Sequence, residues 1–314
     1  MYFGLSDDSQ ALREGLREVL ATACTPAVIR AAWEGSVCEP LWKELGAFGL
    51  PGLLVSEDRG GLGLDELSFV AACEELGYAG APGPVVETLI SLPELDLPLD
   101  GSVRVAVKRN GAVPHAGSAT HVFATRTWSV IEPRVDALLT VDRSRQLGYV
   151  TGPSTQLPVA TEQQALIELR GTLGTAAFLL GLARRQVDLT VAYVKDRKQF
   201  GVPIATFQAI KHPIADAVVG TEFAWPAVLR AAQSLIDGDA DADIHVSMAK
   251  ALASDAAYKV SRVCLQAHGA MGYTVEYDLH LFAKRTWALS KDWGTASQHR
   301  SLIAKRLGIE RTAQ

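Results

Sequence analysis

The apolar and polar positions of the first third of the chain recur with helical periodicity. Leu12, Leu16 and Leu20 follow one another at intervals that place them on one face of a helix. A glycine-rich stretch further along predicts a loop between helices. Further apolar patterns predict helices at 40–48 and 65–76. We therefore expect an N-terminal helical domain over residues 1–97.

The pattern becomes strand-like at about residue 98. Between residues 98 and 158, short β-branched or alternating runs are separated by turn residues, which is typical of antiparallel strands. The segment is roughly half as long as a stable two-layer sheet usually needs. We therefore expect a small, truncated β domain over 98–158.

Helical periodicity returns after the β segment and continues to the end of the chain. A long apolar pattern predicts a helix over 160–197, and three others predict helices over 205–237, 241–270 and 294–308. Long helices joined by short links favour an antiparallel four-helix bundle. The expected fold is therefore mainly α with a small β segment, and its C-terminal domain covers 159–314.

The composition narrows the class of protein further. The 314 residues are 48% hydrophobic and 21% charged, with a formal net charge of −5. This balance excludes a disordered or fibrous chain, and it argues against nucleic-acid binding, which needs a basic surface. The sequence has no run of about 18 uncharged apolar residues that would predict a membrane span. Its four scattered cysteines favour reduced thiols, so we expect a cytoplasmic protein without a metal site.

Two predicted turns carry side chains that suit a phosphate-containing ligand. In RKQFGVPIATFQ at 197–208, the Arg197 guanidinium offers several donors to a pyrophosphate. In QAHGAMGY at 266–273, two glycines permit close approach by a ligand or a second backbone. The structural alternatives are a helix C-terminus satisfied by Arg197 and a simple helix stop at Gly269. The side chains beside Arg197 that add polar groups or flat apolar surface are Gln199, Phe200, Phe207 and Gln208.

A third turn, KDWGTASQHR at 291–300, opens the last predicted helix. Its small and hydroxyl residues, among them Gly294 and Thr295, can receive an anion at the helix N-terminus or simply cap it. His268 is better explained as an interface histidine than as a metal ligand, because no second ligand is spaced to join it.

These motifs resemble the acyl-CoA dehydrogenases over nearly the whole chain. LWKELGAFGLPGLLVSEDRGGLGL is similar to the N-terminal helical domain of that family, and RKQFGVPIATFQAIKHPIADA to its flavin-contacting helix connection. QAHGAMGYTVEYDLHLFAKR and WGTASQHR are similar to the last two family motifs. The resemblance implies the acyl-CoA dehydrogenase fold, FAD as cofactor, and assembly as dimers or dimers of dimers.

The resemblance also implies roles for individual residues. In the family, the arginine of the RKQFG-type motif contacts the pyrophosphate of a flavin held mainly by the neighbouring subunit. The Q-x-x-G-G-x-G motif reaches the adenosine end of the same flavin, although Ala270 replaces its second glycine here. The threonine that follows the family's catalytic glutamate, here Thr295, meets the chain's own flavin. The candidate cofactor-binding residues are Arg197, Gln199, Phe200, Phe207, Gln208, Gln266, Gly269, Ala270, Gly272 and Thr295.

The catalytic base is the clearest departure from the family. The family's reaction removes an α proton from an acyl-CoA thioester while the β hydride moves to flavin N5, so a carboxylate must reach the α carbon. Trp293 stands where that glutamate is usual, and Gly171 stands at the alternative position on the first C-terminal helix. Asp292 and Glu168 are the nearby candidates, and both are more simply explained as solvated or capping carboxylates.

The middle segment departs from the family as well. It lacks the T-E-P…G-S-D and K-x-W-I-T-N motifs, which in the family surround the flavin ring. With these departures, the chain resembles the short subunit of the α2β2 acyl-CoA dehydrogenases of steroid-degrading actinobacteria. In those enzymes a longer subunit holds the flavin and the base. The resemblance implies oxidation of a steroid-derived acyl-CoA to an α,β-unsaturated thioester, with an electron-transfer flavoprotein as acceptor.

Two other functions stay open from the sequence. One is a self-sufficient homo-oligomeric dehydrogenase that uses Asp292 or Glu168 as its base. The other is a catalytically dead helical protein that binds CoA thioesters or acts as a scaffold. Arg197 together with Gln208 disfavours the scaffold, because a scaffold has no need of donors for a pyrophosphate.

Overall fold

The computed structural model describes residues 4–157 and 161–309. The chain divides into two compact units. One, here called the bundle unit, consists mainly of residues 73–79 and 172–314. The other, here called the mixed unit, consists of residues 6–72 and 80–171. The three predicted domains, 1–97, 98–158 and 159–314, are not tested by this division and stay a prediction.

The helices of the mixed unit largely follow the periodicity of the sequence. Helix α1 (Asp7–Ala23) begins where the Ser6 hydroxyl accepts a hydrogen bond from the Ser9 amide, and it buries Leu16 and Leu20. The two further predicted helices are confirmed as α3 (Glu39–Ala47) and α4 (Glu66–Ala79), the second of which continues into the bundle unit. Two short helices were not predicted: α2 (Pro26–Trp33) and α5 (Val85–Ser91). Every residue of α5 is buried, so this helix has no solvent-exposed polar face. Its 7 residues also span too few turns for a helical period to be recognised in the sequence.

The β segment of the mixed unit forms two small sheets. The larger sheet has the strand order β1-β2-β3-β6, and the smaller one pairs β4 with β5. The expectation of an entirely antiparallel segment is wrong for one pair, because β1 and β2 are parallel, with Val105 opposite His121. The chain between these two strands crosses over through a short 3-10 turn instead of reversing in a hairpin. The strands are β1 (Val105–Lys108), β2 (His121–Ala124), β3 (Ser129–Ile131), β4 (Arg134–Ala137), β5 (Gly148–Thr151) and β6 (Ser154–Gln156).

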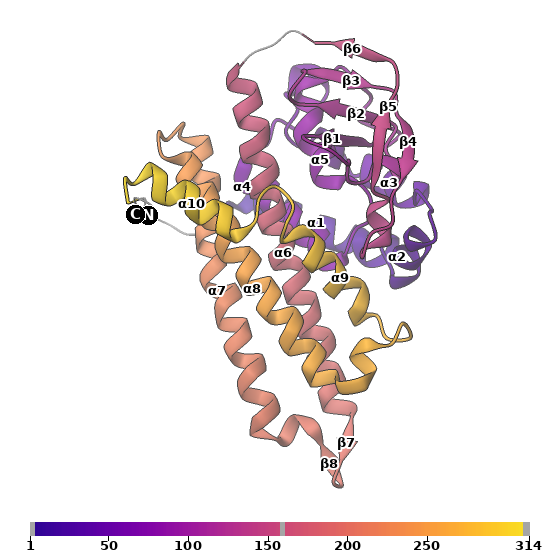
Figure 1. Cartoon of the computed structure of the whole chain (residues 1–314), viewed down its shortest axis with the longest axis vertical. Helices are drawn as coiled ribbons and strands as arrows, with labels where there is room; N and C mark the ends of the chain where they lie inside the picture. The colour runs from indigo at the N-terminus through magenta and orange to yellow at the C-terminus, as the bar shows by residue number, and fades with distance from the viewer. Residues whose placement is uncertain (1–3, 158–160, 310–314) are drawn as a thin grey trace, which may run out of the picture. The chain divides into compact units, whose positions relative to one another are not determined.

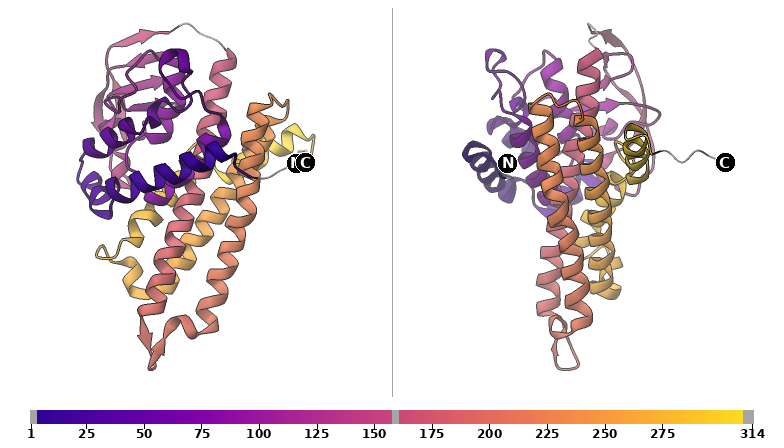
Figure 2. Two further views of the ribbon diagram at one scale, coloured as in Figure 1. Left: turned by 180° about the vertical axis from the view of Figure 1, so that it is seen from behind. Right: turned by 90° about the vertical axis from the view of Figure 1, so that its left-hand side faces the viewer.

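Long helices dominate the bundle unit. The predicted helices are confirmed as α6 (Thr161–Asp196), α7 (Gln208–Ile236), α8 (Ala242–His268) and α10 (Ala296–Arg306). Helices α7 and α8 lie side by side and antiparallel over most of their length (Figure 1; Figure 2). Helix α9 (Leu279–Leu289) was not predicted; it is short, and most of its residues are buried. The short strands β7 (Lys198–Gln199) and β8 (Val202–Pro203) form a hairpin between α6 and α7.

Helix α6 is apolar along most of its length. By length and composition alone it could cross a membrane, although 72% of its most apolar window is buried inside the protein. The end of α4 packs on α6 backbone to backbone: a Cβ at Gly181 would lie 1.9 Å from the Glu74 carbonyl oxygen. Such burial is typical of a core helix, so its composition is weak evidence for a membrane span.

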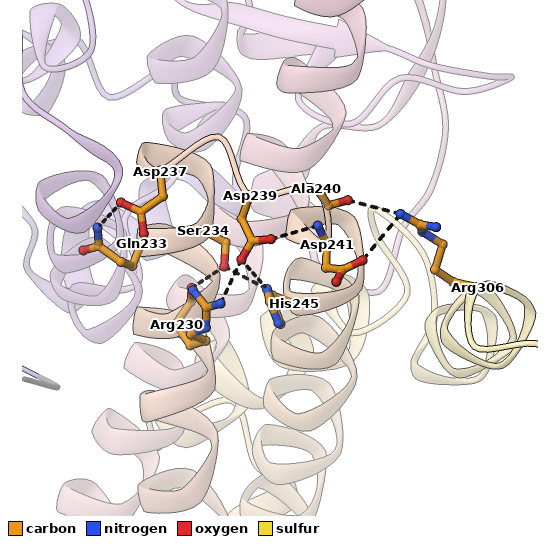
Figure 3. A network of polar contacts seen from close by, with 9 residues as sticks. All are labelled: Arg230, Gln233, Ser234, Asp237, Asp239, Ala240, Asp241, His245 and Arg306. Atoms are coloured by element: carbon orange, nitrogen blue, oxygen red, sulfur yellow. Dashed lines mark hydrogen bonds and ion pairs between the residues drawn. The ribbon is translucent and has the colours of Figure 1, made fainter. Parts of the chain in front are cut away.

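The turn between α7 and α8 is held by a polar network (Figure 3). Arg230 donates to the Asp239 carboxylate at 2.8 Å, and the His245 Nδ1 lies 2.8 Å from the Ser234 hydroxyl. The Asp241 backbone amide, with help from Arg230, lowers the pKa of Asp239 below its ordinary value. From α10, Arg306 donates to the Ala240 and Asp241 oxygens, which ties the C-terminal helix to this turn.

Candidate functional site

The turn after α6 presents aromatic and polar side chains to solvent. It reverses through Phe200 and Gly201, which have φ values of +51° and +81°, and the Ile204 amide closes it on the Arg197 carbonyl oxygen at 2.8 Å. The Phe200 side chain is 93% exposed, and its ring meets the Phe207 ring edge to face, with centroids 6.2 Å apart. Exposed aromatic rings at the tip of a hairpin are typical of a binding surface.

The polar groups of this turn are also exposed. No partner for the Arg197 guanidinium is found among residues 4–157 and 161–309, so it does not satisfy the last carbonyls of α6. Gln199 donates to the neighbouring Lys198 carbonyl, and Gln208 is exposed as the first residue of α7. These donors are therefore available to a ligand or a second chain.

The second predicted turn follows directly on α8. The helix ends at His268, and Gly269 has a φ of +57°, a conformation that favours glycine. Nothing lies within 4 Å of a Cβ built on Gly269, and Gln266 and Ala270 are exposed. Gly272, by contrast, is buried: a Cβ there would lie 3.0 Å from the Leu265 carbonyl oxygen. The turn thus has an open outer surface and a tightly packed inner one.

The structure brings these two turns to the same end of the bundle unit (Figure 1). Val194, Ile214 and Ala267, from α6, α7 and α8, form one buried apolar cluster there. The Tyr193 ring stacks on the His268 ring with centroids 4.2 Å apart. Sequence reasoning missed Tyr193, because no motif or period marks a tyrosine inside a long helix as part of a site.

The third turn does not join the other two within this chain. Thr295 caps α10: its hydroxyl accepts from the Gln298 amide at 3.2 Å, and its own amide donates to the Gln298 side chain at 2.8 Å. The nearby Lys250, on α8, donates to the Gly294 carbonyl oxygen at 3.1 Å. At about 1.5 Å per helical residue, Lys250 and Gln266 lie roughly 24 Å apart along α8. Thr295 therefore belongs to a separate region of the bundle unit.

Both candidate bases have partners within the chain. Asp292 accepts a hydrogen bond from the Trp293 amide at 3.1 Å, and Glu168 pairs with the Arg109 guanidinium at 3.0 Å. Trp293, which the resemblance places at the position of the usual glutamate, is 4% exposed, and its carbonyl oxygen accepts from His299 Nε2 at 2.9 Å. In the described part of the chain, no cluster of three metal-ligating side chains is found.

Comparison with known proteins identifies the family. The model of the acyl-CoA dehydrogenase N-terminal domain matches residues 6–93, and the C-terminal domain model matches residues 165–308. Acyl-CoA dehydrogenase IpdE2 of Mycobacterium tuberculosis is 30% identical over 89% of this chain and 91% of its own length. Acyl-CoA dehydrogenase FadE34 of the same organism is 31% identical over 98% of this chain, which spans only 50% of FadE34. The chain therefore belongs to the acyl-CoA dehydrogenase family.

Solved structures confirm the predicted fold. The ChsE4-ChsE5 complex of Mycobacterium tuberculosis matches with a TM-score of 0.85 and 21% identity, covering all of this chain and all of the matched chain. The Tcur3481-Tcur3483 steroid acyl-CoA dehydrogenase matches with a TM-score of 0.84 and 23% identity, over 96% of this chain and 98% of that one. The mainly helical acyl-CoA dehydrogenase fold with a small β segment is thus confirmed.

Family membership makes FAD the cofactor, as expected from the motifs. The residues present fit it. The Arg197 guanidinium, which has no partner among the described residues, suits a pyrophosphate, and the open surface over Gly269 leaves room for a dinucleotide to approach the backbone.

Proposed function

We propose that this chain is the short subunit of a heteromeric acyl-CoA dehydrogenase and completes a flavin site held mainly by a longer subunit. One observation carries the proposal. The Arg197 guanidinium, which would meet a neighbour's flavin, is exposed and has no partner in the described part of the chain, whereas the position of the base is filled by the buried Trp293. A chain with its own complete site would need a carboxylate there or at the alternative position on α6, where Gly171 stands.

The residues of this chain would act by binding and orienting the cofactor. Arg197 would neutralise the pyrophosphate through charge-assisted hydrogen bonds, and Gln199 and Gln208 would add neutral ones. Gln266 and the turn from Gly269 would hold the adenosine end. When bound, FAD supplies the acceptor for the hydride that leaves the β carbon. The proton from the α carbon would pass to a base on the longer subunit, since neither Asp292 nor Glu168 is free of other partners.

We further propose a steroid-derived acyl-CoA as the substrate and its 2-enoyl thioester as the product. The structural likeness to a steroid acyl-CoA dehydrogenase and to the two-component ChsE4-ChsE5 complex supports this choice. The alignment with FadE34 spans 359 positions, so FadE34 has residues without a counterpart in this 314-residue chain. A shortened middle domain, expected from the sequence, would leave room for a bulky acyl group. An electron-transfer flavoprotein is the proposed acceptor and the cytoplasm the proposed location.

Co-expression with a longer acyl-CoA dehydrogenase from the same source tests the proposal. We expect the chain to be colourless when produced alone and to form a yellow α2β2 complex with about one flavin per pair of subunits. The measurements are the visible spectrum and the native mass. A yellow homo-oligomer whose colour bleaches with an acyl-CoA would contradict the proposal and would return Asp292 and Glu168 as candidate bases.

A further inference from the structure

His268 is the last residue of α8 and directly precedes the turn that begins at Gly269. It is 3% exposed, and its Nδ1 lies 2.8 Å from the Cys264 carbonyl oxygen. Because a carbonyl oxygen only accepts, Nδ1 carries the proton. Burial lowers the pKa of His268, which keeps the ring neutral near pH 7. The other nitrogen, Nε2, is buried and has no hydrogen-bond partner in the described part of the chain.

Two tyrosine rings meet the ring of this histidine. The His268 ring lies 4.2 Å from the Tyr193 ring, with 17° between their planes, and 4.8 Å from the Tyr277 ring. The tyrosine hydroxyls also bond to backbone: Tyr193 donates to the His268 carbonyl oxygen at 3.4 Å, and Tyr277 donates to the Leu189 carbonyl oxygen at 3.2 Å. The cluster therefore joins α6, α8 and the segment that leads into α9.

The stacked pair also reaches both flavin-facing turns. The Arg197 amide donates to the Tyr193 carbonyl oxygen at 2.8 Å, so Tyr193 lies one helical turn before Arg197. At the other turn, a Cβ built on Gly272 would lie 3.1 Å from the Cβ of His268, which shows how closely the turn packs on this side chain. A shift of either ring would therefore move one of the two turns.

We propose that His268 is a positioning residue that holds the 197–208 and 266–273 turns in one fixed relation, so that both meet the same dinucleotide. It acts through its stack on Tyr193, because its buried side chain cannot touch a ligand outside the chain. Because Nε2 has no hydrogen-bond partner in the described part of the chain, the ring contributes through its flat stacking surface and not through this nitrogen. The identity of the ligand rests on the proposed function, whereas the coupling of the two turns is a property of this chain alone.

Three substitutions separate the parts of the side chain. His268→Phe keeps a flat ring but loses the Nδ1 donor, His268→Asn keeps a donor near the Nδ1 position but loses the ring, and His268→Ala loses both. We expect His268→Ala and His268→Asn to speed amide hydrogen exchange by about tenfold in both turns of the full chain, and His268→Phe to stay within about twofold of the natural protein. In the complex with the longer subunit, His268→Ala should raise the FAD dissociation constant about tenfold, and His268→Phe should restore it.

His245→Ala is the matched control, because it removes a histidine from the other end of the same helix (Figure 3). It should leave exchange in both turns unchanged. The inference is overturned if faster exchange is confined to the 266–273 turn, if His245→Ala has the same effect, or if His268→Phe fails to rescue. If exchange couples the turns while Arg197→Ala leaves FAD retention unchanged, the proposed function fails and the positioning role stands.

Discussion

The two halves of α8 lie in opposite kinds of surroundings. Around its C-terminal end, Arg197, Phe200 and Gln266 are exposed, and the Arg197 guanidinium has no partner among residues 4–157 and 161–309. In its N-terminal half, Lys250 is fully buried and donates to Gly294 and neighbouring oxygens. The first region has polar groups available for something outside the chain, whereas the second satisfies its polar groups internally.

Under the proposed function, this difference separates the part of a shared site that the chain has lost from the part that it keeps. The two regions are separated by roughly 24 Å of continuous helix. If Trp293 stands in place of the family's glutamate, as the proposed function holds, that replacement need not disturb the turns around Arg197 and Gln266. Under the proposed function, the internally satisfied region has become structural and the exposed region still binds cofactor. Substitutions in the two regions should then change different quantities.

Removal of the buried ammonium of Lys250 should have the largest effect. Its Nζ donates to the Ser254 hydroxyl at 2.9 Å and to the Gly294 carbonyl oxygen at 3.1 Å, with the Leu289 carbonyl oxygen at 3.4 Å. Lys250→Met would remove the ammonium donor from the Ser254 hydroxyl and the Gly294 carbonyl oxygen. The Leu289 carbonyl oxygen, by contrast, would still accept from the Asp292 amide. We expect the free energy of unfolding, measured by urea denaturation of the complex, to fall by about 3 kcal/mol.

Lys259→Met is the control for that prediction, because Lys259 lies on the same helix with its side chain half-exposed. It pairs with Asp216, whose side chain is 70% exposed. An exposed pair of this kind contributes at most about 1 kcal/mol. Equal losses for the two substitutions would show that the burial of Lys250 has no special role.

Arg197→Ala tests the exposed region. The guanidinium would make charge-assisted hydrogen bonds worth about 1.5–3 kcal/mol to the pyrophosphate, so its loss should raise the FAD dissociation constant of the complex by roughly ten- to a hundredfold. The urea midpoint should hardly change, because the side chain has no partner within the described chain. Arg300→Ala, which removes an exposed guanidinium from α10, should leave FAD affinity unchanged. An unaltered affinity in Arg197→Ala would contradict the cross-subunit role.

Sequence reasoning predicted the elements that show a clear period and missed those that are buried on all sides. The long helices α6, α7 and α8 extend over 27 to 36 residues, whereas α5 and α9 have only 7 and 11 residues and are mostly buried. A short, buried helix offers fewer turns over which a period can be recognised. The parallel pairing of β1 and β2 could not be predicted either, since it depends on the path of the intervening chain.

The candidate site was predictable only where a motif carries it. The exposed residues around Arg197 and Gln266 belong to ordered motifs, and the structure places those motifs together. Lys250, His268 and Tyr193 make their contacts through tertiary packing. A lysine in a helix gives no sign in its sequence that its ammonium is buried among carbonyl oxygens.

Glu168→Gln should have a small effect, and on stability alone. The carboxylate pairs with Arg109 at 3.0 Å, and the two side chains are 42% and 31% exposed. Loss of a partly exposed pair should lower the free energy of unfolding by less than about 1 kcal/mol, and turnover of the complex should stay within about twofold. A hundredfold fall in turnover would identify Glu168 as the base.

Asp292→Asn should have the smallest effect of all. Asparagine retains the side-chain oxygen that accepts from the Trp293 amide at 3.1 Å, so the turn should keep its conformation. It cannot take up the α proton, however, and removal of a true general base costs about a hundred- to ten-thousandfold in rate. Turnover of the reconstituted complex, measured by reduction of an artificial electron acceptor, should therefore stay within about twofold. A hundred- to ten-thousandfold fall in turnover, at unchanged FAD content and native mass, would mean that the region around Asp292 is catalytic. It would contradict the assignment of a purely structural role to this region.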